Sequence, residues 1–85
     1  MAEVLLYTTT VCPFCIRAKA LLSKKQATYR EINLDNNPAM REEMIQKAGG
    51  KRTVPQIFIN GRHVGGCDDL HELDKQGQLD RLLAG

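Results

Sequence analysis

The apolar positions along the chain alternate between two spacings, and each spacing predicts one type of element. Residues 4–9 form an unbroken apolar and β-prone run, which predicts a buried strand. From residue 13 to about residue 25, Cys15, Ala18 and Leu22 recur at i, i+3 and i+7, the spacing of one helix face. A proline opens this segment, and proline suits a first helical turn because its missing N–H would have no partner there. We therefore expect a strand that leads directly into a helix.

A second strand and a second helix are expected in the middle of the chain. Residues 28–34 are assigned to a strand, although their alternation of apolar and polar positions is irregular. Asn37 and Pro38 form a cap-and-proline helix start, and Gly49 and Gly50 are suited to end that helix. The apolar side of this helix consists of Met40, Met44, Ile45 and Ala48.

A hairpin is expected next. Asn60 and Gly61 separate two short apolar segments, residues 56–59 and 62–64. An Asn-Gly dipeptide in this setting is the strongest short signal for a two-residue hairpin turn.

Two helices complete the expected order of elements. Asp68 and Asp69 are expected to cap a helix that Gly77 ends, and residues 79–83 form a last helical segment. The resulting order is β-α-β-α-β-β-α-α, a parallel β-α-β half joined to an antiparallel hairpin. The sequence thus predicts an α/β thioredoxin-like fold, with a four-stranded mixed sheet flanked by helices, in a single domain that spans residues 1–85.

Composition and charge narrow the classes of function. Of the 85 residues, 42% are hydrophobic and 26% are charged, as in an ordinary soluble domain. The net charge is only +2 and the basic residues are interleaved with acidic ones, so no nucleic-acid partner is expected. No apolar run approaches the ~20 residues that cross a bilayer, and no secretory signal is visible at residues 1–4. We therefore expect a cytoplasmic monomer without a membrane partner.

Three cysteines carry the candidate chemistry, and two of them are close together in the chain. Cys12 and Cys15 lie at the expected start of the first helix, far from Cys67, and this sparse set differs from the disulfide framework of a small secreted domain. Only a thiolate attacks a disulfide efficiently, and the free N–H groups at a helix start lower the pKa of a cysteine there from its ordinary value of about 8.5. Cys12 is therefore the candidate nucleophile, within reach of solvent. Cys15, one turn further on, is the shielded resolving thiol.

A zinc site is the main alternative for this pair. Such a site would need further ligands, here Cys67 with His63 or His71. A second C-x-x-C is absent from the sequence, and a strand followed by a helix is the setting of a redox pair. No metal is therefore expected, and both histidines are expected at the solvated surface.

Four motifs together resemble the glutaredoxin family, and the resemblance covers essentially the whole chain. They are residues 7–8, residues 12–15, residues 53–55 and residues 65–69. The small bacterial dithiol type is the most similar. The resemblance implies an enzyme, a glutathione-dependent thiol–disulfide oxidoreductase that reduces protein disulfides and glutathione mixed disulfides. Cys12 and Cys15 would be its catalytic pair, and glutathione its reducing cosubstrate.

The resemblance also implies a glutathione site around this pair. In the family the peptide bond before Pro55 is cis, and the backbone of Val54 pairs with the cysteinyl part of the ligand. The γ-glutamyl end is held by N–H groups at a helix start and by an aspartate, here Asp68, although Asp68 and Asp69 also suit helix caps. The residues implied to bind glutathione are Pro13, Phe14, Arg41, Thr53, Val54, Pro55, Gly66, Cys67 and Asp68.

Two positions depart from the family pattern. Relatives carry a lysine shortly before the first cysteine, where Thr9 stands here, and that lysine contacts the glycine carboxylate of glutathione. Arg41, Lys51 and Arg52 are the candidates to replace it, and Arg41 matches a position that makes this contact in relatives. Phe14 replaces the commoner tyrosine and keeps the aromatic wall without its hydroxyl.

Two other functions remain open for the same fold. A thioredoxin-type electron donor usually carries Trp-Cys-Gly-Pro-Cys, and this chain has no tryptophan. A [2Fe–2S] cluster carrier would use Cys12 of two subunits and two glutathiones, and occurs mostly among relatives that lack a proline at the position of Pro13.

Overall fold

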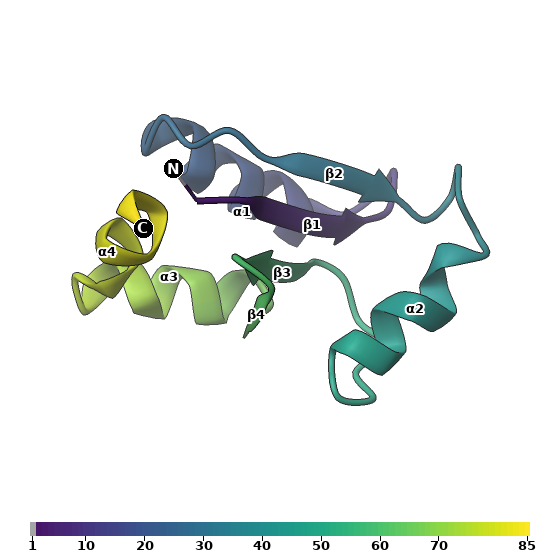
Figure 1. Cartoon of the computed structure of the whole chain (residues 1–85). Helices are drawn as coiled ribbons and strands as arrows, with labels where there is room; N and C mark the ends of the chain where they lie inside the picture. Colours follow the sequence, from purple (N-terminus) through teal and green to yellow (C-terminus); the bar gives the residue numbers. More distant parts are fainter. Residues whose placement is uncertain (1) are drawn as a thin grey trace.

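The computed structural model describes residues 2–85, whose elements follow the expected order (Figure 1). They are β1 (Val4–Thr8), α1 (Pro13–Lys24), β2 (Arg30–Asn33), α2 (Met40–Lys47), β3 (Gln56–Ile59), β4 (Arg62–Gly65), α3 (Cys67–Lys75) and α4 (Gln78–Ala84). β2 is shorter than the strand expected over residues 28–34, where the alternation is irregular. Within the same residues, no helix is long and apolar enough to span a bilayer.

The four strands form one mixed sheet with the order β2-β1-β3-β4. β1 pairs in parallel with β2, and β3 pairs antiparallel with both β1 and β4. The expected thioredoxin-like architecture is therefore confirmed. Because β1 and β3 run in opposite directions, with Tyr7 paired to Gln56, the end of β1 and the start of β3 share one edge of the sheet. This arrangement brings the loop after β1 close to the loop before β3.

One face of the sheet is covered by α1, α3 and α4. Successive side chains of a strand point to opposite faces. On this face Leu6 and Ile57 are fully buried against Leu22 of α1, Leu70 of α3 and Leu79 of α4. The packing fixes the direction of α1, which starts at the edge where β1 ends.

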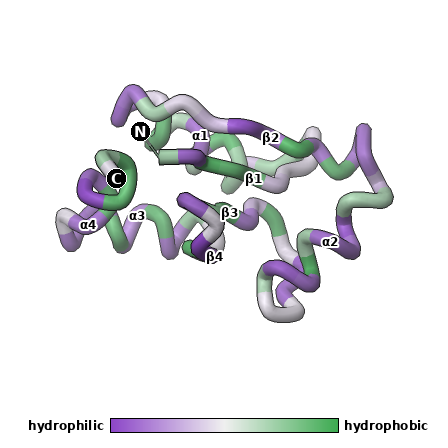
Figure 2. Tube along the Cα trace, viewed as in Figure 1, coloured by the Kyte–Doolittle hydropathy of each residue, from purple (hydrophilic) through white to green (hydrophobic). Residues whose placement is uncertain are grey.

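The opposite face is covered by α2, which lies apart from the other helices in Figure 1. Tyr7 and Phe58 point to this face and pack edge to face, with ring centroids 5.8 Å apart. Met44 and Ala48 supply the apolar side of the helix. In Figure 2 the strand β1 is mostly coloured as hydrophobic, whereas hydrophilic residues predominate along α2.

The helix start expected at Asn37 and Pro38 is wrong. Residues 37–39 form a turn instead, and α2 begins at Met40. The side-chain amide of Asn37 donates to the carbonyl oxygen of Asn33 at 3.1 Å, so it does not cap the helix. The Met40 N–H donates to the Asn37 carbonyl oxygen at 3.0 Å, which closes the turn. A local side-chain bond has displaced the cap.

Two expected turns are confirmed. Asn60 and Gly61 have φ values of 53° and 80°, as a hairpin turn with two left-handed residues requires. At the end of α2, Gly49 and Gly50 also have positive φ, and the Gly50 N–H donates to the Ile45 carbonyl oxygen at 2.8 Å.

Candidate active site

Cys12 and Cys15 meet at the start of α1, where they are joined by a disulfide. Their Cα atoms are 5.2 Å apart, as this spacing at a helix start allows. Cys12 is the N-cap residue, with an extended backbone (φ −151°), and Pro13 follows in the first turn. The Cys15 N–H donates to the Cys12 sulfur at 3.1 Å. The sulfur therefore occupies the position of a capping acceptor, where negative charge is stabilised.

Cys12 is less exposed than the sequence suggested. It is 7% exposed and Cys15 is 1% exposed, so both side chains are largely buried in this oxidised state. The expected asymmetry holds, because Cys12 is the more exposed of the two residues. The surrounding surface is apolar: Val11, Phe14 and Ile16 are the large hydrophobic residues that stay exposed in the described chain.

The turn before β3 lies against the disulfide. The peptide bond between Val54 and Pro55 is cis, as the resemblance implied. The Cys12 sulfur lies 3.9 Å from the Val54 carbonyl oxygen. Because this turn is at the edge where β1 ends, the backbone of Val54 faces the reacting sulfur.

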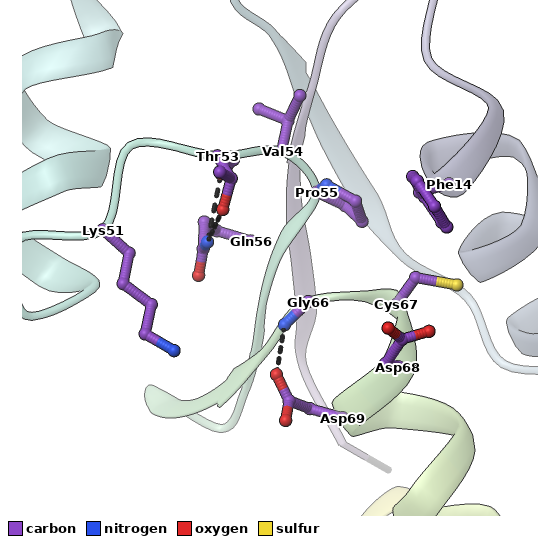
Figure 3. A pocket seen from close by; sticks show the side chains of 10 residues that line it. All are labelled: Phe14, Lys51, Thr53, Val54, Pro55, Gln56, Gly66, Cys67, Asp68 and Asp69. Atoms are coloured by element: carbon purple, nitrogen blue, oxygen red, sulfur yellow. Dashed lines mark hydrogen bonds between the residues drawn. The ribbon is translucent and has the colours of Figure 1, made fainter.

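A cavity of about 300 Å³ adjoins this turn. In Figure 3, Phe14 and Lys51 lie at opposite sides of it, with residues 53–55 above and Gly66 below. Its lining comprises Phe14, Lys51, Thr53, Val54, Pro55, Gln56, Gly66, Cys67, Asp68 and Asp69. The structure thus brings together seven of the nine residues expected to bind glutathione. Pro13 and Arg41 are outside this lining.

The start of α3 forms one wall of the cavity. Asp69 accepts a hydrogen bond from the Gly66 N–H at 2.9 Å, so its predicted capping role is confirmed. Asp68 has no hydrogen-bond partner among residues 2–85, and its carboxylate is exposed. Burial raises the pKa of the Cys67 thiol, which keeps this cysteine protonated and unreactive at neutral pH.

The cations considered in place of the missing lysine lie in different places. Lys51 lines the cavity. Arg41 instead donates to the Arg52 carbonyl oxygen at 3.2 Å and lies in a separate hollow over α2, together with Arg52. Lys51 is therefore the one of these three cations that lines the cavity.

Gln56 was missed by the sequence reasoning. It lines the cavity directly after Pro55, and it is a polar residue only 1% exposed. The sequence did offer a signal for it. Gln56 is a polar residue in a short apolar strand, and a buried amide there needs hydrogen-bond partners.

The expectation that both histidines are solvated is wrong. His63 is half-buried and bonds to Gln56, with its Nε2 2.7 Å from the amide oxygen. His71 is also half-buried, and its Nε2 has no partner among the described residues. Within residues 2–85, no group of three or more His, Cys, Asp or Glu side chains is arranged to hold a metal ion, so the zinc alternative finds no ligand set there.

Known proteins are similar to this chain in both sequence and fold. The Glutaredoxin family model matches residues 4–64. The chain is 57% identical over 83 residues to glutaredoxin 3 of Escherichia coli K12, covering 98% of this chain and 99% of that protein. It is 54% identical over 84 residues to glutaredoxin of Pseudomonas aeruginosa, covering 99% of each. The crystal structure of a buckwheat glutaredoxin–glutathione complex superposes with a TM-score of 0.89, at 35% identity, over 98% of this chain and 77% of that one.

These similarities agree with the geometry. A cysteine pair at a helix start, beside a cis-proline turn on a thioredoxin-like sheet, defines a thiol–disulfide oxidoreductase. The chain belongs to the glutaredoxin family.

Proposed function

We propose that this protein reduces protein disulfides and glutathione mixed disulfides, with glutathione as its reducing cosubstrate. The observation that carries the proposal is the cavity beside the disulfide, which has the 53–55 turn on one side and the start of α3 on the other. A tripeptide thiol needs backbone pairing for its cysteine and a helix start for its carboxylate. The similarity to the buckwheat protein, which was solved as a complex with glutathione, supports the same ligand here.

In the reduction of a mixed disulfide, the Cys12 thiolate attacks the glutathionyl sulfur. A bond forms between Cys12 and glutathione, the substrate S–S bond breaks, and the substrate cysteine leaves as a thiolate that takes up a proton. A second glutathione thiolate attacks the same glutathionyl sulfur. Glutathione disulfide is released and the Cys12 thiolate is restored.

In the reduction of a protein disulfide, Cys12 first forms a mixed disulfide with the substrate. Cys15 loses its proton and attacks the Cys12 sulfur, so the substrate leaves as a dithiol. The product is the Cys12–Cys15 disulfide, the state that the structure contains. Two molecules of glutathione reduce it again.

We assign each part of glutathione to a different wall of the cavity. The Val54 backbone would pair with the cysteinyl residue, and Asp68 with the N–H groups of α3 would bind the γ-glutamyl end. Phe14 and Pro13 would flank the sulfur. The glycine carboxylate would be bound by a cation, Lys51 or Arg41. The remaining proposed contacts are Thr53, Pro55, Gly66 and Cys67.

Two cysteine variants test the mechanism. Cys12→Ser is expected to abolish reduction of both substrate types, because it removes the nucleophile. Cys15→Ser is expected to retain the reduction of glutathione mixed disulfides and to lose that of protein disulfides. The assay follows NADPH oxidation coupled through glutathione reductase. Cys67→Ser is the matched control and should keep both activities, because Cys67 would contact glutathione through its backbone and not through its thiol.

Three results would contradict the proposal. A fully active Cys12→Ser variant would remove the assigned nucleophile, and turnover sustained by thioredoxin reductase but not by glutathione would indicate a thioredoxin-type donor. A coloured cluster after anaerobic reconstitution, without reductase activity, would favour the iron–sulfur carrier.

We also propose that the protein works as a monomer in the cytoplasm, where glutathione keeps such a pair supplied with electrons.

A further inference from the structure

A chain of side-chain hydrogen bonds runs from the turn before β3 to the edge strand β4. The Gln56 amide nitrogen donates both to the Thr53 carbonyl oxygen, at 3.0 Å, and to the Thr53 Oγ1, at 3.2 Å (dashed lines in Figure 3). On its other side, the Gln56 Oε1 lies 2.7 Å from the His63 Nε2. Thr53 is therefore linked to His63 through one buried amide.

The direction of these bonds determines where the proton of His63 lies. The Gln56 nitrogen is already used as the donor toward Thr53, so Oε1 faces His63 and acts only as an acceptor. The His63 Nε2 must then carry hydrogen, either in the neutral Nε2–H tautomer or in the imidazolium form. Because Gln56 is 1% exposed, water is a poor substitute for this donor.

The geometry also explains why Thr53 needs this support. Thr53 precedes Val54, whose carbonyl oxygen lies 3.9 Å from the Cys12 sulfur, and its own side chain is exposed. Gln56 follows Pro55, and its buried side chain donates two hydrogen bonds to Thr53, which connect the two ends of the turn. Loss of the bond from His63 leaves the Gln56 oxygen unpaired and frees the amide to rotate away from Thr53.

We propose that His63 is a positioning residue for glutathione binding. It touches no reacting atom. It holds the Gln56 amide in the orientation that fixes Thr53, and thereby the Val54 backbone, for pairing with the cysteinyl part of the ligand. This inference rests on the function proposed above, and assigns a role to a residue outside the cavity lining.

His63 also packs its ring on Phe58, with centroids 5.0 Å apart, so two variants are needed to separate packing from hydrogen bonding. His63→Phe keeps a ring and removes the donor. His63→Gln removes the ring and keeps a donor of similar reach. We expect His63→Phe to raise KM for a glutathionylated peptide about threefold to tenfold, the range set by one hydrogen bond, with kcat nearly unchanged. His63→Gln should stay within about twofold of the wild type.

If the His63 ring served only for packing, the order of the KM values would be reversed, with His63→Gln impaired and His63→Phe normal. This result would overturn the proposal. Equal KM values in all three proteins would also overturn it. A second measurement needs no variant: ¹⁵N NMR of the wild-type imidazole should show hydrogen on Nε2, and a neutral Nδ1–H tautomer would contradict the bond. An inactive wild type would instead overturn the proposed function itself.

Discussion

The Cys12 sulfur lies 3.9 Å from the carbonyl oxygen of Val54, although 42 residues separate them in the chain. The contact exists because β1 ends where β3 begins, at the same edge of the sheet. It places a sulfur at the start of α1 beside a backbone segment with which an extended cysteinyl peptide could pair. The following predictions concern the residues that support this arrangement.

Lys51 is expected to contribute more to glutathione binding than Arg41. Lys51 lines the cavity, whereas Arg41 is bonded to a carbonyl oxygen over α2. An exposed ion pair contributes up to about 1 kcal/mol, so Lys51→Gln should raise KM for glutathione by up to about fivefold. The effect should shrink at high salt. Arg41→Gln is the matched comparison, and a larger effect there would assign the glycine carboxylate to α2 instead.

Gly65→Ala is expected to damage the start of α3. Gly65 has a φ of 121°, and an added Cβ would collide with the side chain of Asp69, which accepts from the Gly66 N–H. A side chain at a positive φ costs about 1–3 kcal/mol, and at Gly65 the collision adds to this cost. Gly50→Ala is the control, because its φ is also positive but its Cβ would meet no atom within 4 Å. Thermal unfolding and KM should both be worse for Gly65→Ala; equal behaviour would exclude a role for the Asp69 contact.

Tyr7 is expected to ionise only at very high pH. It is fully buried, and its hydroxyl donates to the Glu43 Oε2 at 2.9 Å. Burial, followed by this bond and the charge of Glu43, raises the pKa of Tyr7 to about 12. Since the folded pKa is above the ordinary value of about 10, the stabilisation is complete below pH 10 and is lost between about pH 10 and pH 12.

The chain has two tyrosines and no tryptophan, so a Tyr29→Phe variant leaves Tyr7 as the sole tyrosine chromophore. Its ultraviolet absorbance should report ionisation near pH 12. A midpoint close to 10 in the folded protein would show that neither burial nor the bond to Glu43 raises this pKa in solution.

Thr8→Val is expected to destabilise the protein near neutral pH. The Thr8 hydroxyl is fully buried and donates to the Glu31 Oε2 at 2.7 Å, while Lys19 lies 3.0 Å from the same oxygen. The bond from Thr8, and then Lys19, lowers the pKa of Glu31. The stabilisation is therefore present above the ordinary pKa of Glu31 and is lost as the pH falls through its lower folded value.

Urea unfolding should show a loss of about 1–2 kcal/mol for Thr8→Val at pH 7 and a smaller loss in acid. Thr28→Val, at an exposed threonine, is the control and should be neutral. Equal stability of Thr8→Val and the wild type at pH 7 would contradict the prediction.

Much of the architecture could be predicted because its signals are local. Three such signals each act on their own backbone, so their effect can be predicted without knowledge of the fold. They are the Asn60-Gly61 turn, the proline at the start of α1 and the glycines after α2. The motifs shared with the family made it possible to predict residues of the site as well. The predicted start of α2 was wrong because the Asn37 side chain has a competing partner, the Asn33 carbonyl oxygen. A rule for helix caps does not take such a partner into account.

The sequence by itself determined the order of elements and the cysteine pair, since both depend on neighbours within a few residues. Only the tertiary structure decided that Lys51 rather than Arg41 lines the cavity, and that His63 supports Gln56 across two strands. The reason is physical. A buried polar group must find its partner wherever the packed sheet and helices leave one, and that partner is set by distance in space, not by spacing along the chain.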